Sequence, residues 1–231
     1  MIGKSIAANL VSLRERVEKA RESTTRRQSV ELVAVSKFHS CDKIAEAISA
    51  GQNVFAENYV QEALQKITQI NSRNISWHFI GNIQKNKIKH LVGPFSLIQS
   101  VAEFAVAKKI SEHAKAIQIR QKILLQVNIG VETSKGGIIL SDVKNLFMEC
   151  QNLEGIKVTG LMCLPPLECE DQQKRQFFRQ MRESFELISK IADNDFVTLS
   201  MGTSHDFELA IAEGSNMVRI GTDIFGERPK E

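Results

Sequence analysis

Glu31-Leu32-Val33-Ala34-Val35-Ser36-Lys37 is the stretch on which the expected fold depends. Leu32 to Val35 form a continuous apolar run, which is typical of a strand buried on both faces of a parallel sheet. Lys37 follows at the carboxyl end of this strand, where ligands gather in α/β sheets and where partial burial makes an amine more nucleophilic. On this segment alone, a lysine whose charged end reaches solvent is the simpler interpretation.

The composition is that of an ordinary globular protein. The 231 residues are 42% hydrophobic and 25% charged, enough for one large α/β barrel or two ordinary domains. The net charge of +3 comes from interspersed basic and acidic residues, which argues against a nucleic-acid partner. The four cysteines include no Cys-x-x-Cys pair and suit structural thiols in a reducing compartment. Because the sequence also lacks a membrane-length apolar run and a signal-peptide core, we expect a cytoplasmic protein without a membrane partner.

Strand and helix patterns alternate about eight times along the chain, after an amphipathic helix predicted from Ser5 to about Glu22. The strands are expected at residues 32–35, 53–56, 77–81, 95–98, 122–128, 155–161, 196–200 and 217–220. The helices between them are expected at 41–50, 58–70, 83–91, 102–119, 141–151, 171–192 and 204–212.

This alternation favours a (β/α)₈ TIM barrel with an extra N-terminal helix, as one domain covering residues 1–231. A doubly wound open sheet is the alternative, and for a dinucleotide it needs a Gly-x-Gly-x-x-Gly turn after the first strand. Lys37-Phe38-His39-Ser40 follows that strand here and contains no glycine, so the barrel is preferred.

In a barrel, the residues at the strand ends line one mouth, and here they include Lys37, Asn58, His78 with Gly81, Asn128, Met162, Ser200 and Arg219. Two of the following loops have the composition of a phosphate site. Ser200-Met201-Gly202-Thr203-Ser204-His205-Asp206 leads into a helix, and Arg219-Ile220-Gly221-Thr222 closes the eighth strand. Glycines admit backbone N–H groups, and hydroxyls and a helix N-terminus add donors to an anion. Two ordinary turns, with Ser204 as a helix N-cap, are the simpler alternative.

A lysine opposite a phosphate site suggests pyridoxal 5′-phosphate (PLP) as the cofactor. PLP needs a lysine for its Schiff base, an anion site for its phosphate and a partner for its pyridine nitrogen. Arg219 is the candidate partner, and because arginine can only donate, it would hold the nitrogen unprotonated and weaken the ring as an electron sink. A salt bridge from Arg219 to a nearby acid is the alternative, and the acids available are Glu213, Asp223 and Glu227.

Several motifs resemble the pyridoxal phosphate homeostasis protein family, the proline-synthetase co-transcribed group. They are Val33-Ala34-Val35-Ser36-Lys37, Glu57-Asn58-Tyr59-Val60-Gln61-Glu62, His78-Phe79-Ile80-Gly81 with Gln84 and Asn86-Lys87, Gly160-Leu161-Met162, Leu199-Ser200-Met201-Gly202 with Ser204 and Asp206, Met217-Val218-Arg219-Ile220-Gly221-Thr222, and Ile224-Phe225-Gly226. They span nearly the whole chain in order. The resemblance implies a fold-type III PLP barrel, similar to the N-terminal domain of alanine racemase.

The resemblance also implies roles for individual residues. Lys37 would carry PLP as a Schiff base, Arg219 would face the pyridine nitrogen, and a further set would bind the cofactor: Asn58, His78, Ser200, Met201, Gly202, Ser204, Gly221 and Thr222. The sequence departs from the family pattern at Ala56, Gly136, Thr203 and His205. Ala56 is expected to tighten the turn beside the ring, and His205 to add a titratable donor near the phosphate site. Lys135 is a further candidate, for a second anion contact or for cofactor hand-over, against the simpler interpretation of a solvated loop lysine.

Three functions fit these expectations. The first is a PLP-binding regulator, expected to be a monomer, that holds PLP and supplies it to apoenzymes with little or no catalysis. The second is an amino-acid racemase, but racemases similar to alanine racemase use a second domain and a tyrosine base. This chain stops after the eighth unit, and Tyr59 is its only tyrosine. The third is a barrel enzyme that acts on another phosphorylated small molecule. The first is preferred.

Overall fold

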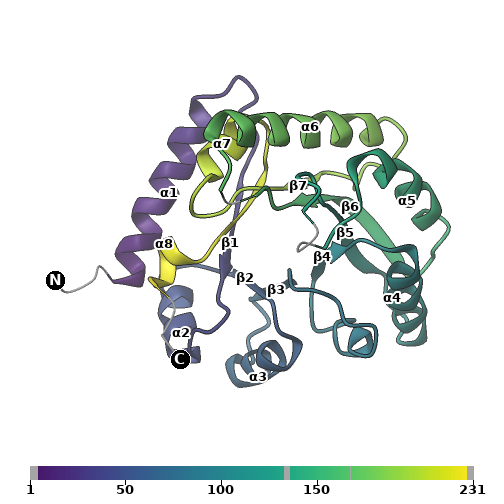
Figure 1. Ribbon diagram of the computed structural model, residues 1–231. Helices are drawn as coiled ribbons and strands as arrows, with labels where there is room; N and C mark the ends of the chain where they lie inside the picture. Colours follow the sequence, from purple (N-terminus) through teal and green to yellow (C-terminus); the bar gives the residue numbers. More distant parts are fainter. Residues whose placement is uncertain (1–4, 133–135, 167, 228–231) are drawn as a thin grey trace.

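The computed structural model describes residues 5–132, 136–166 and 168–227, so Lys135 lies outside the described residues. Eight parallel strands close into a barrel in sequential order, with the first strand paired to the last (Figure 1). The predicted TIM barrel is confirmed. Its strands are β1 (Glu31–Val35), β2 (Val54–Glu57), β3 (Ser76–Phe79), β4 (Leu97–Val101), β5 (Gln121–Val127), β6 (Ile156–Cys163), β7 (Thr198–Ser200) and β8 (Met217–Ile220).

Helices follow the strands and surround the barrel. They are α2 (Cys41–Ser49), α3 (Val60–Ile70), α4 (Phe104–Ala116), α5 (Val143–Cys150), α6 (Asp171–Ser189), α7 (Phe207–Ala212) and α8 (Thr222–Phe225), with the 3₁₀ turns η1 (Ile88–His90) and η2 (Leu140–Asp142). The helix predicted at residues 83–91 is wrong, because only η1 forms there. Asn82 and Asn86 belong to a residue type that favours turns, and the Lys87 N–H accordingly bonds Gln84 O at i−3 (2.9 Å).

The extra N-terminal helix is α1 (Ile6–Glu22), as expected from its apolar spacing. Ser5 caps it, because the Ser5 Oγ accepts a hydrogen bond from the Ala8 N–H (3.2 Å). Its buried side chains, which include Leu10 and Leu13, face the barrel. In Figure 1 this purple helix lies along one side of the molecule, where it contacts α2, α7 and α8. It therefore covers the seam where β8 closes onto β1.

Two apolar cores stabilise the barrel. The larger one lies between the strands and the surrounding helices, and it includes the buried residues of α1. The smaller one comprises Val33, Val54, Ala56, Leu97, Leu124, Met162 and Met217. These residues come from six of the eight strands, and side chains of this kind fill the interior of a TIM barrel. Ala56 therefore packs within this interior cluster from β2, which corrects the expectation that it shapes a turn beside the ring.

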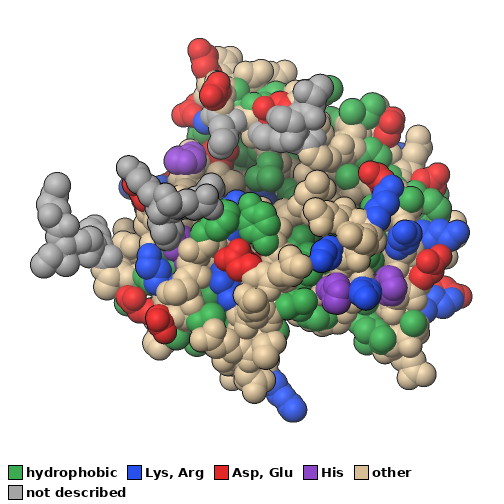
Figure 2. Space-filling model, turned by 60° about the horizontal axis from the view of Figure 1, so that its bottom comes forward, with side chains coloured by type: hydrophobic (Ala, Val, Ile, Leu, Met, Phe, Trp, Pro, Cys, Tyr) green, Lys and Arg blue, Asp and Glu red, His purple; other side chains and the backbone are tan. Residues whose placement is uncertain are grey.

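The surface agrees with the composition. On the face seen in Figure 2, Lys and Arg side chains are interspersed with Asp and Glu. Within the described ranges, no helix is both long and apolar enough to cross a membrane. The same part of the chain brings together no group of three or more His, Cys, Asp or Glu residues that could hold a metal ion.

Candidate functional site

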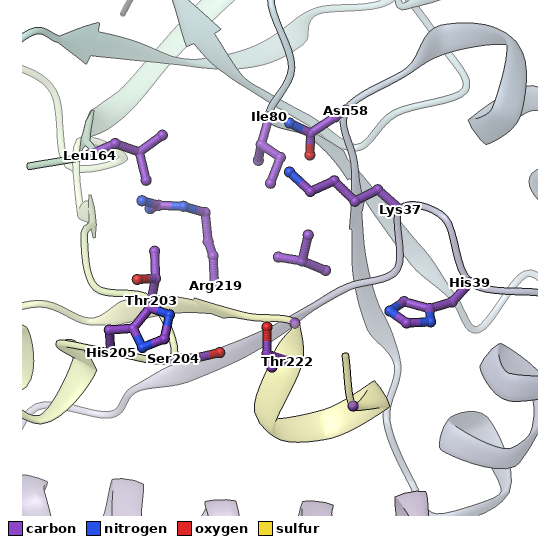
Figure 3. Close-up of a pocket in the computed structure, with 13 residues that line it drawn as sticks. Lys37, His39, Asn58, Ile80, Leu164, Thr203, Ser204, His205, Arg219 and Thr222 are labelled. Carbon is purple, nitrogen blue, oxygen red and sulfur yellow. The ribbon is translucent and has the colours of Figure 1, made fainter. Parts of the chain in front are cut away.

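A cavity of about 250 Å³ lies at the mouth formed by the carboxyl ends of the strands. Lys37 enters it from the end of β1, and Arg219 from β8, the strand paired beside β1. In Figure 3 the Lys37 amine points toward the side on which Arg219 lies, with Asn58 and Ile80 above and Ser204 and Thr222 below. The remaining lining residues are Val35, His39, Leu164, Thr203, His205, Gly221 and Gly226.

Lys37 is half-buried and lies on a tight turn of residues 36–39, here called the lysine turn. The Ser36 N–H continues the sheet by bonding Ala56 O (3.1 Å), and the His39 N–H closes the turn on Ser36 O (3.1 Å). Phe38 has a positive φ of 66°, a left-handed conformation that is uncommon for a bulky residue. Such a conformation persists only where its surroundings enforce it.

A buried ionic network enforces it from below. The Lys66 Nζ donates hydrogen bonds to Ser36 O (2.7 Å), Glu57 Oε1 (2.7 Å) and Glu62 Oε1 (2.6 Å). Glu62 Oε1 also accepts from the Phe38 N–H (2.7 Å), so the network binds the backbone on both sides of Lys37. Burial raises the pKa of the Glu57 carboxyl above its usual range, against the opposing effect of Lys66 and the Ser36 hydroxyl.

Arg219 is buried, and its two terminal nitrogens are held by uncharged groups. Nη1 donates to the Ser200 hydroxyl, and Nη2 donates to Cys163 O (2.8 Å). Burial lowers the pKa of Arg219 to about 10, so the guanidinium remains charged at neutral pH.

Two of the three acids expected as alternative partners of Arg219 are engaged elsewhere. Asp223 pairs with Arg16 (2.8 Å), and Glu213 pairs with Arg182 (3.4 Å). Among the residues that the structure describes, no carboxylate forms an ion pair with Arg219. Against the larger effect of burial, Asp206 acts on the Arg219 charge through space and raises the pKa of Arg219. A buried cation that no carboxylate contacts as an ion pair can hold a lone pair or an anion in the cavity.

The two predicted phosphate loops form the opposite wall of the cavity. Gly202 has a φ of +98°, and a Cβ atom there would lie 2.7 Å from the Ala210 Cβ, so only glycine suits this position. Asp206 Oδ1 accepts from both the N–H (2.7 Å) and the hydroxyl (3.0 Å) of Thr203 and thereby fixes the loop. Figure 3 shows the hydroxyls of Ser204 and Thr222 on the same side of the cavity.

The structure brings together six of the ten residues expected to bind the cofactor: Lys37, Asn58, Ser204, Arg219, Gly221 and Thr222. Three others support the wall from behind, because Ser200, Met201 and Gly202 are buried and do not line the cavity. His205 lies in the lining beside Ser204, as expected for a donor near the phosphate loops.

His78 is placed differently from the expectation. It lines a separate cavity with Ser76 and Ser96, which stand at the amino-terminal ends of β3 and β4. Because most residues of these inner strands are buried, the sequence did not show which end of the barrel the ring reaches. Burial lowers the pKa of His78 to about 4, so the imidazole is neutral at neutral pH.

Two further strand-end residues also lie outside the cavity lining. Asn128 closes its own loop, with Nδ2 donating to Glu132 O (2.8 Å), and Met162 packs inside the barrel. Gly81 is explained by backbone packing, since a Cβ there would lie 1.9 Å from Asn58 O.

Sequence reasoning missed the groups beneath the site, namely Lys66 with its two glutamates, and Gln99. Gln99 was detectable in principle, because it is a polar residue within the apolar strand β4, and buried polar groups of this kind require partners.

Comparisons with known proteins agree with this geometry. The family model for the N-terminal domain of alanine racemase matches residues 8–229. The chain is 40% identical to the pyridoxal phosphate homeostasis protein of Aquifex aeolicus, over 93% of this chain and 94% of that protein. It is 37% identical to the protein of the same name from Escherichia coli K12, over 96% of this chain and 97% of that protein.

Solved structures show the same likeness. PipY of Synechococcus elongatus PCC7942 superposes with a TM-score of 0.88 without PLP and 0.84 with PLP bound, at 33% and 32% identity. Each comparison covers 96% of this chain and 100% of PipY. Alanine racemase from Corynebacterium glutamicum, at 16% identity and a TM-score of 0.71, shares the fold over 97% of this chain and 61% of that chain.

Proposed function

The chain belongs to the pyridoxal phosphate homeostasis protein family, and from this membership we propose that it binds PLP at the barrel mouth and supplies it to apoenzymes. PipY, its relative in that family, has been solved with PLP bound. The observation that carries the proposal is that the Lys37 amine and the buried Arg219 guanidinium, whose hydrogen bonds go to uncharged groups, line one cavity. When bound, PLP supplies an aldehyde that condenses with a primary amine.

The donor set of the cavity fits this cofactor group by group. Lys37 provides the primary amine, and Arg219 provides a fixed donor for the pyridine nitrogen. The hydroxyls of Ser204 and Thr222, with the backbone of Gly221, provide donors for the phosphate. Asn58 lines the wall beside Lys37. We assign these six residues as the cofactor site and place Ser200, Met201 and Gly202 behind it.

Little or no catalysis is part of the proposal, and two features support it. Arg219 is permanently charged and can only donate hydrogen bonds, so it cannot keep the pyridine nitrogen protonated as a carboxylate would. Tyr59, the only tyrosine in the chain and therefore the only one that could serve as the second base of a racemase, is half exposed and packs on Phe38 with ring centroids 5.2 Å apart, away from the cavity lining. We further propose that the chain acts as a single-domain monomer in the cytoplasm.

Titration of the purified protein with PLP, followed by visible absorbance, tests the site. Wild type should develop the band of protein-bound PLP, and Lys37→Ala should lose it. Lys87→Ala is the matched control, because Lys87 lies beyond Asn58 in a neighbouring groove and should retain the band. Incubation of loaded protein with a PLP-dependent apoenzyme should then restore that enzyme's activity. A wild type that stays colourless with added PLP contradicts the proposal.

The Arg219→Glu variant tests whether Arg219 is the reason for the proposed low catalytic activity. A carboxylate at this position can share a proton with the pyridine nitrogen, which strengthens electron withdrawal by the ring. Slow transamination or racemisation should therefore rise above the wild-type level, with a change in the spectrum of the bound cofactor. An unchanged spectrum would mean that residue 219 does not contact the nitrogen.

A further inference from the structure

A chain of buried hydrogen bonds runs from Arg219 through the barrel interior. The Ser200 hydroxyl, which accepts from Arg219 Nη1, donates to Gln99 Oε1 (2.7 Å). Gln99 Nε2 contacts His78 Nδ1 (3.0 Å), and His78 Nε2 makes a long contact with Ser76 Oγ (3.5 Å). The chain thus links the cavity at the carboxyl ends of the strands to the cavity at their amino-terminal ends.

The chemistry of its two ends gives this chain one direction. A guanidinium can only donate, so Ser200 accepts from Arg219 and must place its single proton on Gln99 Oε1. The amide group of Gln99 then faces His78 as a donor, which requires an unprotonated Nδ1 and a proton on Nε2.

The far end of the chain agrees with this direction. Ser96 Oγ donates to Trp77 O (3.0 Å), so the hydroxyl of Ser76 must donate to Ser96 (2.6 Å). Ser76 Oγ is then left as an acceptor for the His78 Nε2 proton. Every link therefore donates away from Arg219, and reversal of any one link would set two donors or two acceptors against each other.

From this we propose that Gln99 and His78 are positioning residues for Arg219. They keep the Ser200 proton turned away from the guanidinium, so that Nη1 always meets a lone pair and the charged plane keeps one orientation toward the cavity. The inference rests on the proposed function for its consequence, namely that Gln99 and His78 raise the affinity for PLP without touching it. His78, which the sequence suggested as a direct ligand, acts in this account through two intermediates.

The uncharged nature of the chain is as important as its direction. Oε1 of Gln99 is an acceptor and Nε2 is a donor. The amide therefore fixes the donor–acceptor order from Ser200 to His78 without placing a charge beneath Arg219. Methionine at position 99 would keep the length of the side chain and remove both groups. The Ser200 hydroxyl could then rotate, and of the two bonds that hold the guanidinium only the one to Cys163 O would keep a fixed direction.

Nitrogen-15 NMR of the protein without added PLP, comparing wild type with Gln99→Met, tests the positioning role directly. Wild type should show His78 as the Nε2–H tautomer and slow rotation of the Arg219 guanidinium. Gln99→Met should speed this rotation at least about fivefold, the factor that one net hydrogen bond contributes, and should raise the PLP dissociation constant by about the same factor. Gln121→Met is the matched control, because it removes a buried glutamine bonded to Phe95 O (2.9 Å), outside the chain, and should change neither measurement.

The outcomes separate this inference from the proposed function. An Nδ1–H tautomer of His78 in wild type overturns the inference without any variant, and equal Arg219 rotation in wild type and Gln99→Met overturns it as well. A wild type that binds no PLP overturns the proposed function and leaves the NMR result to decide on the chain. Tight PLP binding in wild type with unchanged affinity in Gln99→Met refutes the inference and leaves the proposed function intact.

Discussion

Lys37 and Arg219 face the same cavity, but the groups beneath them differ in charge. Under Lys37 lies the ionic network of Lys66, Glu57 and Glu62, which binds the backbone on both sides of the lysine. Under Arg219 lies an uncharged chain of hydroxyl, amide and imidazole groups, which binds the side chain itself.

The difference matches what each residue has to do. A lysine that reacts as an amine has to lose its proton, so a support that holds the backbone fixes its position while allowing its charge to change. An arginine that orients a ring nitrogen has to remain charged and still, and neutral partners hold it without cancelling its charge. Breaking either support should therefore have consequences of a different kind.

Lys66→Met should have the largest effect on stability. It leaves the buried Glu57 carboxyl without its cation, and removing one partner of a buried ion pair costs about 3–5 kcal/mol. The free energy of unfolding from urea titration should fall by this amount, and PLP binding should weaken because the lysine turn loses its anchor. The double variant Glu57→Gln with Lys66→Met should recover part of the loss. A Lys66→Met protein as stable as wild type would show that the network does not hold the turn.

His78, a member of the uncharged chain beneath Arg219, should make the stability of the protein depend on pH. The pKa of His78 is lowered from its ordinary 6.5 to about 4, so between these values the unfolded chain binds a proton that the folded chain does not. Stability should thus fall as the pH drops from about 6.5 to about 4, by up to about 3 kcal/mol from this residue. Burial also raises the pKa values of Glu31 and Glu57, which acts in the opposite direction over the acidic part of this range.

A comparison of variants isolates the His78 contribution. His78→Gln should lack this loss, and His113→Gln, which changes an exposed histidine on α4, should retain it. Equal pH slopes in wild type and His78→Gln, from urea titrations at several pH values, would contradict a neutral His78 in the folded chain.

The smallest effect on stability and PLP affinity is expected from an exposed ion pair that supports neither Lys37 nor Arg219. Lys85 and Glu103 form an exposed pair (3.0 Å), and such pairs contribute little because water and salt screen them. Lys85→Met should leave the urea midpoint and the PLP affinity within experimental error of wild type. A loss comparable to that of Lys66→Met would mean that burial does not distinguish the two pairs.

The sequence predicted the residues that face the cavity better than those that support them. The run from Leu32 to Val35 is long, apolar and uninterrupted, so it identified β1 and placed Lys37 at its end. The strand that contains Arg219 and the glycine and hydroxyl residues after it placed the opposite wall in the same way. These features depend on local pattern and on the rule that parallel strands end at one face.

The supporting groups depend on contacts between distant segments, which pattern alone does not show. Gln99 and Ser200 lie 101 residues apart in sequence, and Lys66 reaches Ser36 across 30. Strand β4 is buried at every position, so its residues carry no alternation that would place Gln99 inside the barrel. On β3 only Ser76 is partly exposed, so the sequence likewise did not show that His78 reaches the amino-terminal end of the barrel.

Covalent trapping tests the central claim, that Lys37 holds the cofactor opposite Arg219, most directly. The wild-type protein is incubated with PLP, reduced with borohydride, digested, and its peptides are examined by mass spectrometry. We expect a phosphopyridoxyl group on Lys37 in near-stoichiometric yield and only traces on other lysines. Labelling spread over surface lysines, or the same total yield of phosphopyridoxyl label from the Lys37→Ala variant, would contradict a cofactor held by Lys37.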